Sequence, residues 1–227
     1  SNRERYVFKH ALVQETAYQS LLKSRRNEVH AKIAKFLQQQ VAASGDMTDS
    51  DPGLIAHHFT EAGDFKNAVP LWLTAGRQAA QRSANIEAIS HFSKALEQLG
   101  SLPENTERDQ QELNLQMALG TARMVTNGFA DPDIEQGLAR ASDLCTSLGA
   151  QDEMVDVLVG LWAYHVSGQS PLTTARNVAN QLLDLARQSG DSTALLKAHI
   201  VMSINLFYQG EFSDMPSHLD ECLSRYN

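Results

Sequence analysis

The sequence predicts an all-α fold built from successive helical hairpins. Apolar residues recur at helical spacing along nearly the whole chain, and strand-like alternation occurs only at Tyr6, Val7 and Phe8. Glycines recur at a nearly fixed period, with Gly120 and Gly160 separated by 40 residues. A helical chain with such an internal period is typical of an array in which each hairpin packs only on its neighbours.

Two amphipathic helices are expected near the N-terminal end. Each has apolar residues spaced so that they form one helix face. These faces are Leu12, Ala17, Leu21 and Leu22 in the first helix, and Val29, Ile33, Phe36 and Leu37 in the second.

Several later helices have recognisable capping sequences at their starts. Asp51 precedes Pro52, so an acidic N-cap is followed by a proline at the first helical position, where the missing backbone N–H has no consequence. The other predicted starts are Asp131-Pro132, Ser170-Pro171 and a helix capped by Thr106.

The glycines indicate how each repeat is built. Gly128 and Gly168 are 40 residues apart, and Gly149 and Gly190 are 41 apart. Each unit is therefore expected to contain a helix with a small interior residue, a glycine turn, a second helix and a closing glycine. Because a glycine inside a helix costs about 1 kcal/mol relative to alanine, the interior glycines predict a close approach by a neighbouring helix.

The stretch from residue 72 to residue 103 has the clearest repeat signature. Its large, small and aromatic positions follow the tetratricopeptide pattern, although Ala79 occupies a position where an aromatic residue is usual. The chain is therefore predicted to form a right-handed superhelix of antiparallel helical hairpins, a tetratricopeptide-like α-solenoid. The matching positions are Trp72, Ala75, Gly76, Ala88, Phe92, Ala95, Gly100 and Pro103.

These signals divide the chain into an N-terminal segment and a repeat region. The segment covers residues 1–45, and the repeats cover residues 46–227. Their expected bounds are about 46–105, 106–149, 150–190 and 191–227.

A curved array of hairpins forms a groove lined by the first helix of each unit, and such grooves bind peptides, partner helices or small ligands. Helical register places five residues as candidates to line it. The alternative is that the aromatic members are ordinary core between repeats. The candidates are Thr121, Tyr164, His165, Phe207 and Tyr208.

Sequence patterns of common catalytic and metal sites are missing. The sequence has no phosphate-binding loop, zinc-protease helix, Cys-x-x-Cys pair or hydrolase elbow. His57 and His58 are adjacent on a predicted helix and point about 100° apart, which is poor geometry for one metal ion. Cys145 and Cys222 both fall on apolar helix stripes, where cysteine is usually a small hydrophobic residue. We therefore expect no catalytic, metal or cofactor site in this chain.

Charge is distributed unevenly along the sequence. Residues 1–40 carry a net charge of +5, whereas residues 41–227 carry −13. The acidic part disfavours nucleic acid as a partner. No long apolar run indicates a membrane span, and two cysteines suit a reducing cytoplasm. The basic residues of the N-terminal segment have the spacing of a solvated helix face, with contact to an acidic neighbour as the alternative; they are Lys23, Arg25, Arg26, Lys32 and Lys35.

Three stretches of the sequence resemble a segment of large bacterial signal-transduction ATPases with numerous domains. They are residues 6–22 (YVFKHALVQETAYQSLL), 25–30 (RRNEVH) and 55–63 (IAHHFTEAG). Residues 72–76 (WLTAG) and 83–92 (SANIEAISHF) are also similar to that family. The resemblance is most specific at residues 10–22.

In that family the segment follows the nucleotide-binding domain and leads into a tetratricopeptide-like superhelix. Many members of this version also have a class III adenylate or guanylate cyclase domain. The resemblance thus implies a regulatory, non-enzymatic module that binds a protein or small ligand and contacts neighbouring domains of its parent. The alternative is the sensor array of a maltose-regulator-like transcriptional activator, whose repeats have a similar longer period. Assembly into homo-oligomers through exposed end repeats also stays open.

Overall fold

The computed structural model describes residues 16, 18–44, 51–129 and 131–226, and these residues are almost entirely helical. No strand occurs among them, so the all-α prediction is confirmed for the described part of the chain. The alternation at Tyr6, Val7 and Phe8, and the apolar face that begins at Leu12, lie outside the described residues.

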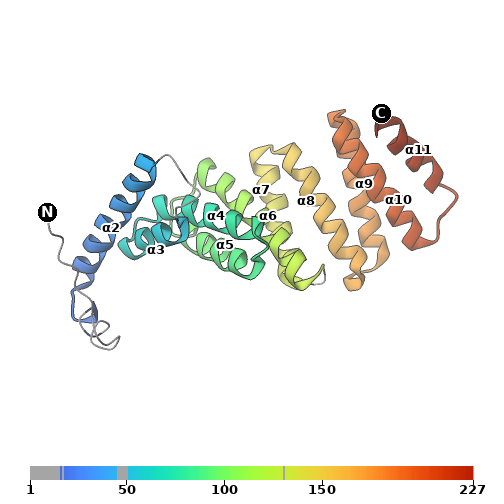
Figure 1. Ribbon diagram of the computed structural model, residues 1–227. Helices are drawn as coiled ribbons and strands as arrows, with labels where there is room; N and C mark the ends of the chain where they lie inside the picture. The colour runs from blue at the N-terminus through green and yellow to red at the C-terminus, as the bar shows by residue number, and fades with distance from the viewer. Residues whose placement is uncertain (1–15, 17, 45–50, 130, 227) are drawn as a thin grey trace.

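The helices follow one another in a simple order along the chain (Figure 1). They are α2 (Lys23–Ser44), α3 (Pro52–Ala62), α4 (Phe65–Gln81), α5 (Asn85–Leu99), α6 (Thr106–Asn127), α7 (Pro132–Leu148), α8 (Gln151–Tyr164), the π-helical turn η1 (His165–Gln169), α9 (Leu172–Ser189), α10 (Ser192–Gln209) and α11 (Met215–Tyr226).

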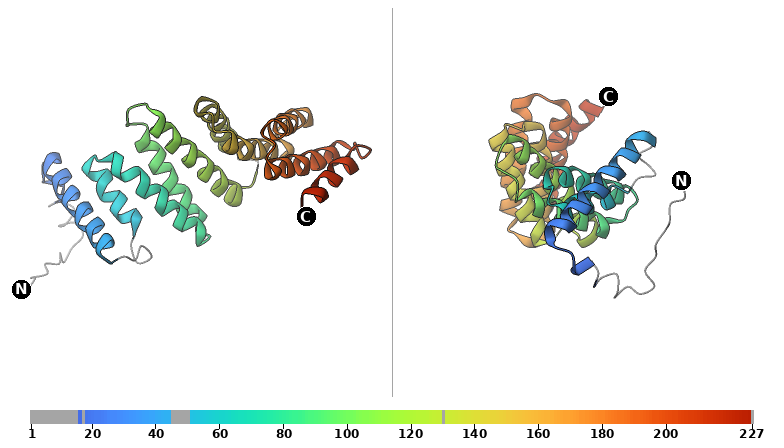
Figure 2. Two further views of the ribbon diagram at one scale, coloured as in Figure 1. Left: turned by 90° about the horizontal axis from the view of Figure 1, so that it is seen from above. Right: turned by 90° about the vertical axis from the view of Figure 1, so that its left-hand side faces the viewer.

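Each helix packs mainly against the helices before and after it in the sequence. In addition, α4 contacts α6, and α8 contacts α10. The result is an elongated row of helices with α2 at one end and α11 at the other (Figures 1 and 2). Among the described residues, none of the helices combines the length and the apolar character needed to cross a membrane.

The apolar core is divided along this row. One large cluster joins α2 to α6 and includes Phe59, Trp72 and Phe92, all at most 3% exposed. A second joins α8, α9 and α10 and includes Trp162 and Leu206. Smaller clusters between α6, α7 and α8 connect the two. Because the buried residues of these clusters pack mainly between adjacent helices, the stability of the row is shared between neighbours along the chain.

Two of the predicted helix caps are present. The Asp51 side chain accepts a hydrogen bond from the backbone N–H of Leu54 at 3.0 Å, and that of Asp131 accepts one from Asp133 at 3.0 Å. Each acid therefore satisfies a backbone donor that the first turn of its helix leaves unpaired.

Two other predicted starts were wrong. Asn105, not Thr106, caps α6, since its side chain accepts the backbone N–H of Arg108 at 2.9 Å. Pro171 itself occupies the cap position of α9 and makes no side-chain cap bond. The Ser170 hydroxyl instead bonds to Nδ1 of His165 at 2.9 Å, so this serine fixes the preceding turn.

Two interior glycines face the same leucine, but only Gly160 shows the close approach that the sequence predicted for both. A Cβ on Gly160 would lie 3.0 Å from Cδ1 of Leu138, and one on Gly120 would lie 4.0 Å from Cδ2 of the same residue. Helices α6 and α8 therefore meet α7 through this side chain. Gly149 and Gly190 both end their helices in the left-handed conformation, with φ of 67° and 68°. A residue with a side chain would be strained there.

The apolar face predicted for α2 is only partly buried. Val29 and Phe36 are 38% and 49% exposed, whereas His30 and Ala34 are buried. The prediction assumed packing of the whole apolar stripe, but α3 is the helix that α2 mainly contacts. One neighbour covers a narrower stripe than two neighbours would.

Candidate interaction surface

The five predicted groove residues lie at three places along the row. Thr121 is exposed on α6, and its hydroxyl donates to the carbonyl oxygen of Met117 at 3.0 Å. Tyr164 and His165 lie where α8 passes into η1, and Phe207 and Tyr208 lie in the last turn of α10. Helices α6, α8 and α10, with the turn η1 after α8, thus supply them, but their side chains differ in exposure.

Tyr164 and His165 are buried, at 6% and 8% exposed. Tyr164 packs with Ile134 and Leu138 of α7, and its ring meets the His165 ring edge-on at 5.3 Å between centroids. Burial, followed by the neighbouring carboxylate of Glu135, raises the pKa of Tyr164 above its usual value. This environment is the ordinary inter-helix core that the sequence left as the alternative for these two residues.

Phe207 and Tyr208 are exposed, at 59% and 54%. Phe207 contacts Tyr208 and also Phe212 of the following turn, with ring centroids 5.9 and 6.0 Å apart. The turn is anchored to α9, because Arg176 donates to the side-chain oxygens of Gln209 at 2.8 Å and Glu211 at 3.1 Å. The aromatic group of Phe207, Tyr208 and Phe212 is therefore exposed to solvent but lies at a turn that hydrogen bonds hold to α9.

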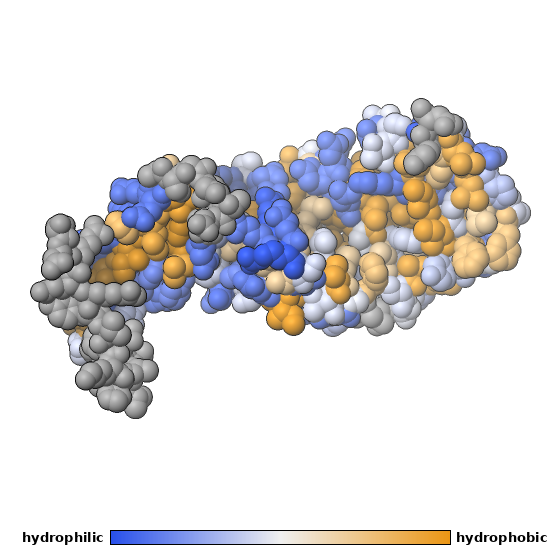
Figure 3. All heavy atoms as spheres, viewed as in Figure 1, coloured by the Kyte–Doolittle hydropathy of each residue, from blue (hydrophilic) through white to orange (hydrophobic). Residues whose placement is uncertain are grey.

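Phe207 continues an apolar stripe along the solvent side of α10. Ile200, Ile204 and Phe207 are spaced by four and three residues, which places them on one helix face. Ile200 and Ile204 are 43% and 39% exposed. We call these three residues the α10 stripe. Figure 3 shows hydrophobic residues gathered at the end of the molecule formed by α9, α10 and α11.

An acidic region adjoins the other end of the α10 stripe. Lys197, one turn before Ile200, forms an ion pair with Asp156 of α8. A shallow pocket between the first turns of α8 and α10 is lined by this pair together with Asp152 and Asp191. The α8–α10 face thus runs from a net negative pocket, along exposed isoleucines, to an aromatic group.

The sequence analysis found Phe207 but missed the two isoleucines of the stripe. The reason is that α10 is apolar on nearly all sides, a pattern that predicts a fully buried helix. The spacing of Ile200, Ile204 and Phe207 was the available signal. This spacing becomes informative only once the structure shows that the opposite face of α10, which contains Ala198, is the buried one.

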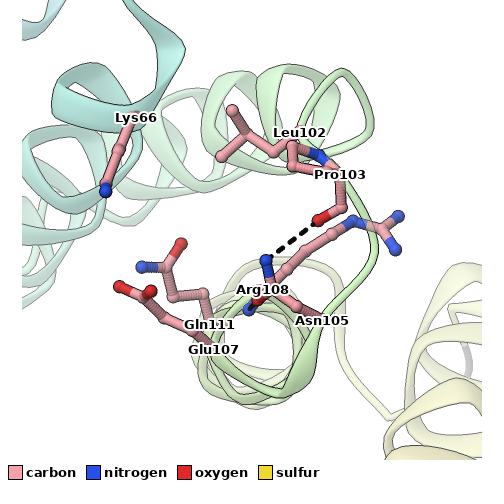
Figure 4. Close-up of a pocket in the computed structure, with 7 residues that line it drawn as sticks. All are labelled: Lys66, Leu102, Pro103, Asn105, Glu107, Arg108 and Gln111. Carbon is pink, nitrogen blue, oxygen red and sulfur yellow. Dashed lines mark hydrogen bonds between the residues drawn. The ribbon is translucent and has the colours of Figure 1, made fainter.

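A further pocket lies where α4, the α5–α6 loop and α6 meet (Figure 4). Two of its polar side chains hold the loop: Asn105 caps α6 and also donates to the carbonyl of Pro103 at 3.3 Å, while Nε of Arg108 donates to the carbonyl of Leu99 at 3.2 Å. Lys66 faces Glu107 across the pocket. Asn105 and Arg108 thus have structural roles here, and we assign this pocket no ligand.

Residues that could support metal or thiol chemistry are dispersed. Within the described residues, no group of three or more His, Cys, Asp or Glu side chains could hold a metal ion. Cys145 is buried in the core between α6, α7 and α8, where burial raises the pKa of its thiol. Cys222 on α11 is a half-buried free thiol whose pKa is also raised by burial. Both thiols are therefore weak nucleophiles at neutral pH.

Comparison with known proteins gives one significant relative. No model of a known protein family matches the chain. A stretch of 128 residues is 33% identical to an uncharacterized protein of Rhizobium meliloti (strain 1021). This stretch covers 56% of the present chain but 12% of the relative, so the chain spans only a small part of that protein's length.

Proposed function

We propose that this chain is a non-catalytic regulatory repeat module that binds a protein or a small ligand within a multidomain bacterial signalling ATPase of the adenylate cyclase-like kind. The parent would act in intracellular signal transduction in the cytoplasm. Binding would bias it between conformational states, because a ligand shifts such an equilibrium by its difference in affinity for the two states.

Support for the repeat architecture comes from the order of packing. Each helix contacts its chain neighbours, and in addition α4 contacts α6 and α8 contacts α10. Packing between neighbours, with some contact between alternate helices, suits a tetratricopeptide-like superhelix of helical hairpins. The length of the relative, roughly eight times the aligned stretch, suits a module within a multidomain protein.

The α10 stripe is the observation that carries the binding proposal. Exposed apolar residues on a helix face, rimmed by polar groups, are typical of protein interaction sites. The stripe starts next to the acidic pocket at Asp152 and Asp156 and ends in the aromatic group at Phe207. A complementary partner is an amphipathic segment with an apolar row and a lysine or arginine at one end.

Peptide selection tests this proposal directly. A displayed library of 15-residue peptides is selected on the chain, and the affinities of the selected peptides are measured by fluorescence anisotropy. We expect sequences with an apolar row and a basic end, bound roughly tenfold more weakly by Ile204→Asp and by Phe207→Ser. Val125→Ser is the matched control, since Val125 is 67% exposed on α6, away from the stripe. Selected peptides that bind all three variants equally would exclude the stripe as the site.

A second candidate is the sensor array of a maltose-regulator-like transcriptional activator. The observation that favours it is the repeat period of 40 to 41 residues between corresponding glycines. The domain encoded next to these repeats in the full gene separates the two candidates: a DNA-binding domain supports the activator, and a cyclase domain supports the signalling ATPase.

A further inference from the structure

Two pairs of histidines face each other across the first and last helix contacts of the described row. Nδ1 of His30 on α2 lies 2.8 Å from Nδ1 of His58 on α3. Nδ1 of His199 on α10 lies 2.9 Å from Nδ1 of His218 on α11. The two contacts have the same atoms and nearly the same length, although they lie at opposite ends of the row (Figure 1).

The geometry allows each pair at most one extra proton. In the neutral pair, one Nδ1 carries a hydrogen and donates it, and the other accepts it through its lone pair. A first extra proton can be bound at a distant Nε2 without breaking this bond. A second gives both rings an Nδ1–H, so that two donors and two positive charges meet at less than 3 Å. The contact then has to open.

The surroundings of the first pair are mixed in charge. His30 also bonds to the Tyr18 hydroxyl through Nε2 at 2.9 Å. Arg26 on α2 and His57 on α3 oppose protonation, whereas Glu61 on α3 favours it. Burial is the largest influence, and it lowers the pKa of both His30 and His58.

The second pair lies among more positive groups. Arg187 and Arg176 of α9 and Arg225 of α11 oppose protonation, and Asp214 and Glu221 favour it. Burial again has the largest effect and lowers the pKa of both His199 and His218. The arginines that oppose protonation thus come from α9 as well as from α11.

We propose that the two histidine pairs are pH-sensitive latches, which hold α2 and α11 on the row at neutral pH and release them on acidification. His199 is 6% exposed and contacts His218 of α11, so release of that helix uncovers a side of α10 that lies about 100° around the helix axis from its exposed stripe. The proposal concerns the chain alone and does not depend on a partner for the α10 stripe.

The direction follows from proton linkage. A histidine with a lowered pKa in the folded state binds fewer protons there than in the released state, where its pKa is about 6.5. The latches therefore contribute their full stability above about pH 6.5 and lose it as the pH falls toward the lowered folded-state values.

Hydrogen exchange of the intact chain tests the latches, with mass spectrometry at pH 7.5 and 5.5, EDTA present throughout, and rates corrected for the intrinsic effect of pH. We expect corrected exchange in α2 and α11 to accelerate about tenfold at pH 5.5, with α4 and α5 unchanged, because the released histidines bind protons more tightly than the paired ones.

Two asparagine variants separate the latches from each other. In His218→Asn, the amide oxygen can accept from Nδ1 of His199 in either protonation state, so α11 loses its pH response while α2 keeps it. His58→Asn has the opposite pattern. His165→Asn is the control, because His165 pairs with Ser170 and not with another histidine. Equal corrected exchange of α11 at both pH values in the unmodified chain, or an unchanged pH response in both variants, overturns the proposal.

Discussion

The ring of Phe92 on α5 occupies the space above Gly76 on α4 where any larger residue would place its Cβ. A Cβ built on Gly76 would lie 2.8 Å from Cζ of Phe92 and closer still to the near edge of the ring. Both residues are buried, and Phe92 is 1% exposed. The close approach of α4 and α5 therefore depends on the absence of a side chain at position 76.

Replacing Gly76 with alanine is expected to destabilise the chain by about 1–3 kcal/mol, because overpacking outweighs the gain in helix propensity. Urea denaturation followed by far-UV circular dichroism measures the change. Gly120→Ala is the control, since its Cβ would meet Leu138 at an ordinary 4.0 Å. We expect that variant to be neutral or slightly more stable. A Gly76→Ala protein as stable as the Gly120→Ala protein would contradict the packing argument.

The contrast between Gly76 and Tyr164 shows what the sequence could predict. Gly76 and Phe92 occupy fixed positions of a repeat pattern, so their roles follow from local spacing along two adjacent helices. Whether Tyr164 is buried depends on Ile134 and Leu138 of another helix and on the turn at η1, which no local period specifies. The helices and the packing role of Gly76 could therefore be predicted from the sequence. The solvent exposure of side chains on α8 and α10 could not.

Asn105 and Thr106 give a direct test of the cap of α6. Asn105→Ala is expected to lower the free energy of unfolding by about 1 kcal/mol, because the backbone N–H of Arg108 loses its acceptor. Thr106→Ala, one residue later, should change it by less than about 0.5 kcal/mol, as is usual for exposed positions. Equilibrium urea unfolding of the two variants decides between them. A larger loss for Thr106→Ala would restore the cap that the sequence analysis assigned to threonine.

The indole N–H of Trp162 on α8 donates to the side-chain oxygen of Asn205 on α10 at 3.3 Å, and Asn205 is fully buried. Asn205→Ala should cost about 1–3 kcal/mol, because the buried indole N–H would be left without an acceptor. Thermal unfolding monitored by tryptophan fluorescence reports the loss. Asn180→Ala, at an exposed site on α9, is the comparison and should change stability little. If both variants unfold at the same temperature, the contact between α8 and α10 does not depend on this bond.

A bidentate ion pair joins α6 to α7, with Nε and Nη2 of Arg140 donating to the two carboxylate oxygens of Glu112 at 2.7 and 2.8 Å. The hydrogen bonds from Arg140 hold the pKa of Glu112 below its usual range, although burial partly opposes them. An acid with a lowered folded-state pKa adds stability above its unfolded pKa of about 4.3, and this stability disappears as the pH falls through the folded value.

Glu112→Gln should therefore lower the free energy of unfolding at pH 7 by about 1 kcal/mol, a modest value because Arg140 is 43% exposed to solvent. At pH 3 the loss should shrink, because the carboxyl of the unfolded chain, with a pKa of about 4.3, is then mostly protonated and the unmodified protein has already lost part of this stability. Urea unfolding of both proteins at pH 7, 5 and 3 measures the difference. Glu104 pairs with Arg108 at 3.6 Å but is 91% exposed, so Glu104→Gln provides a control with a smaller expected effect at pH 7. A Glu112→Gln loss that stays constant between pH 7 and pH 3 would assign the effect to packing and not to the charge of Glu112.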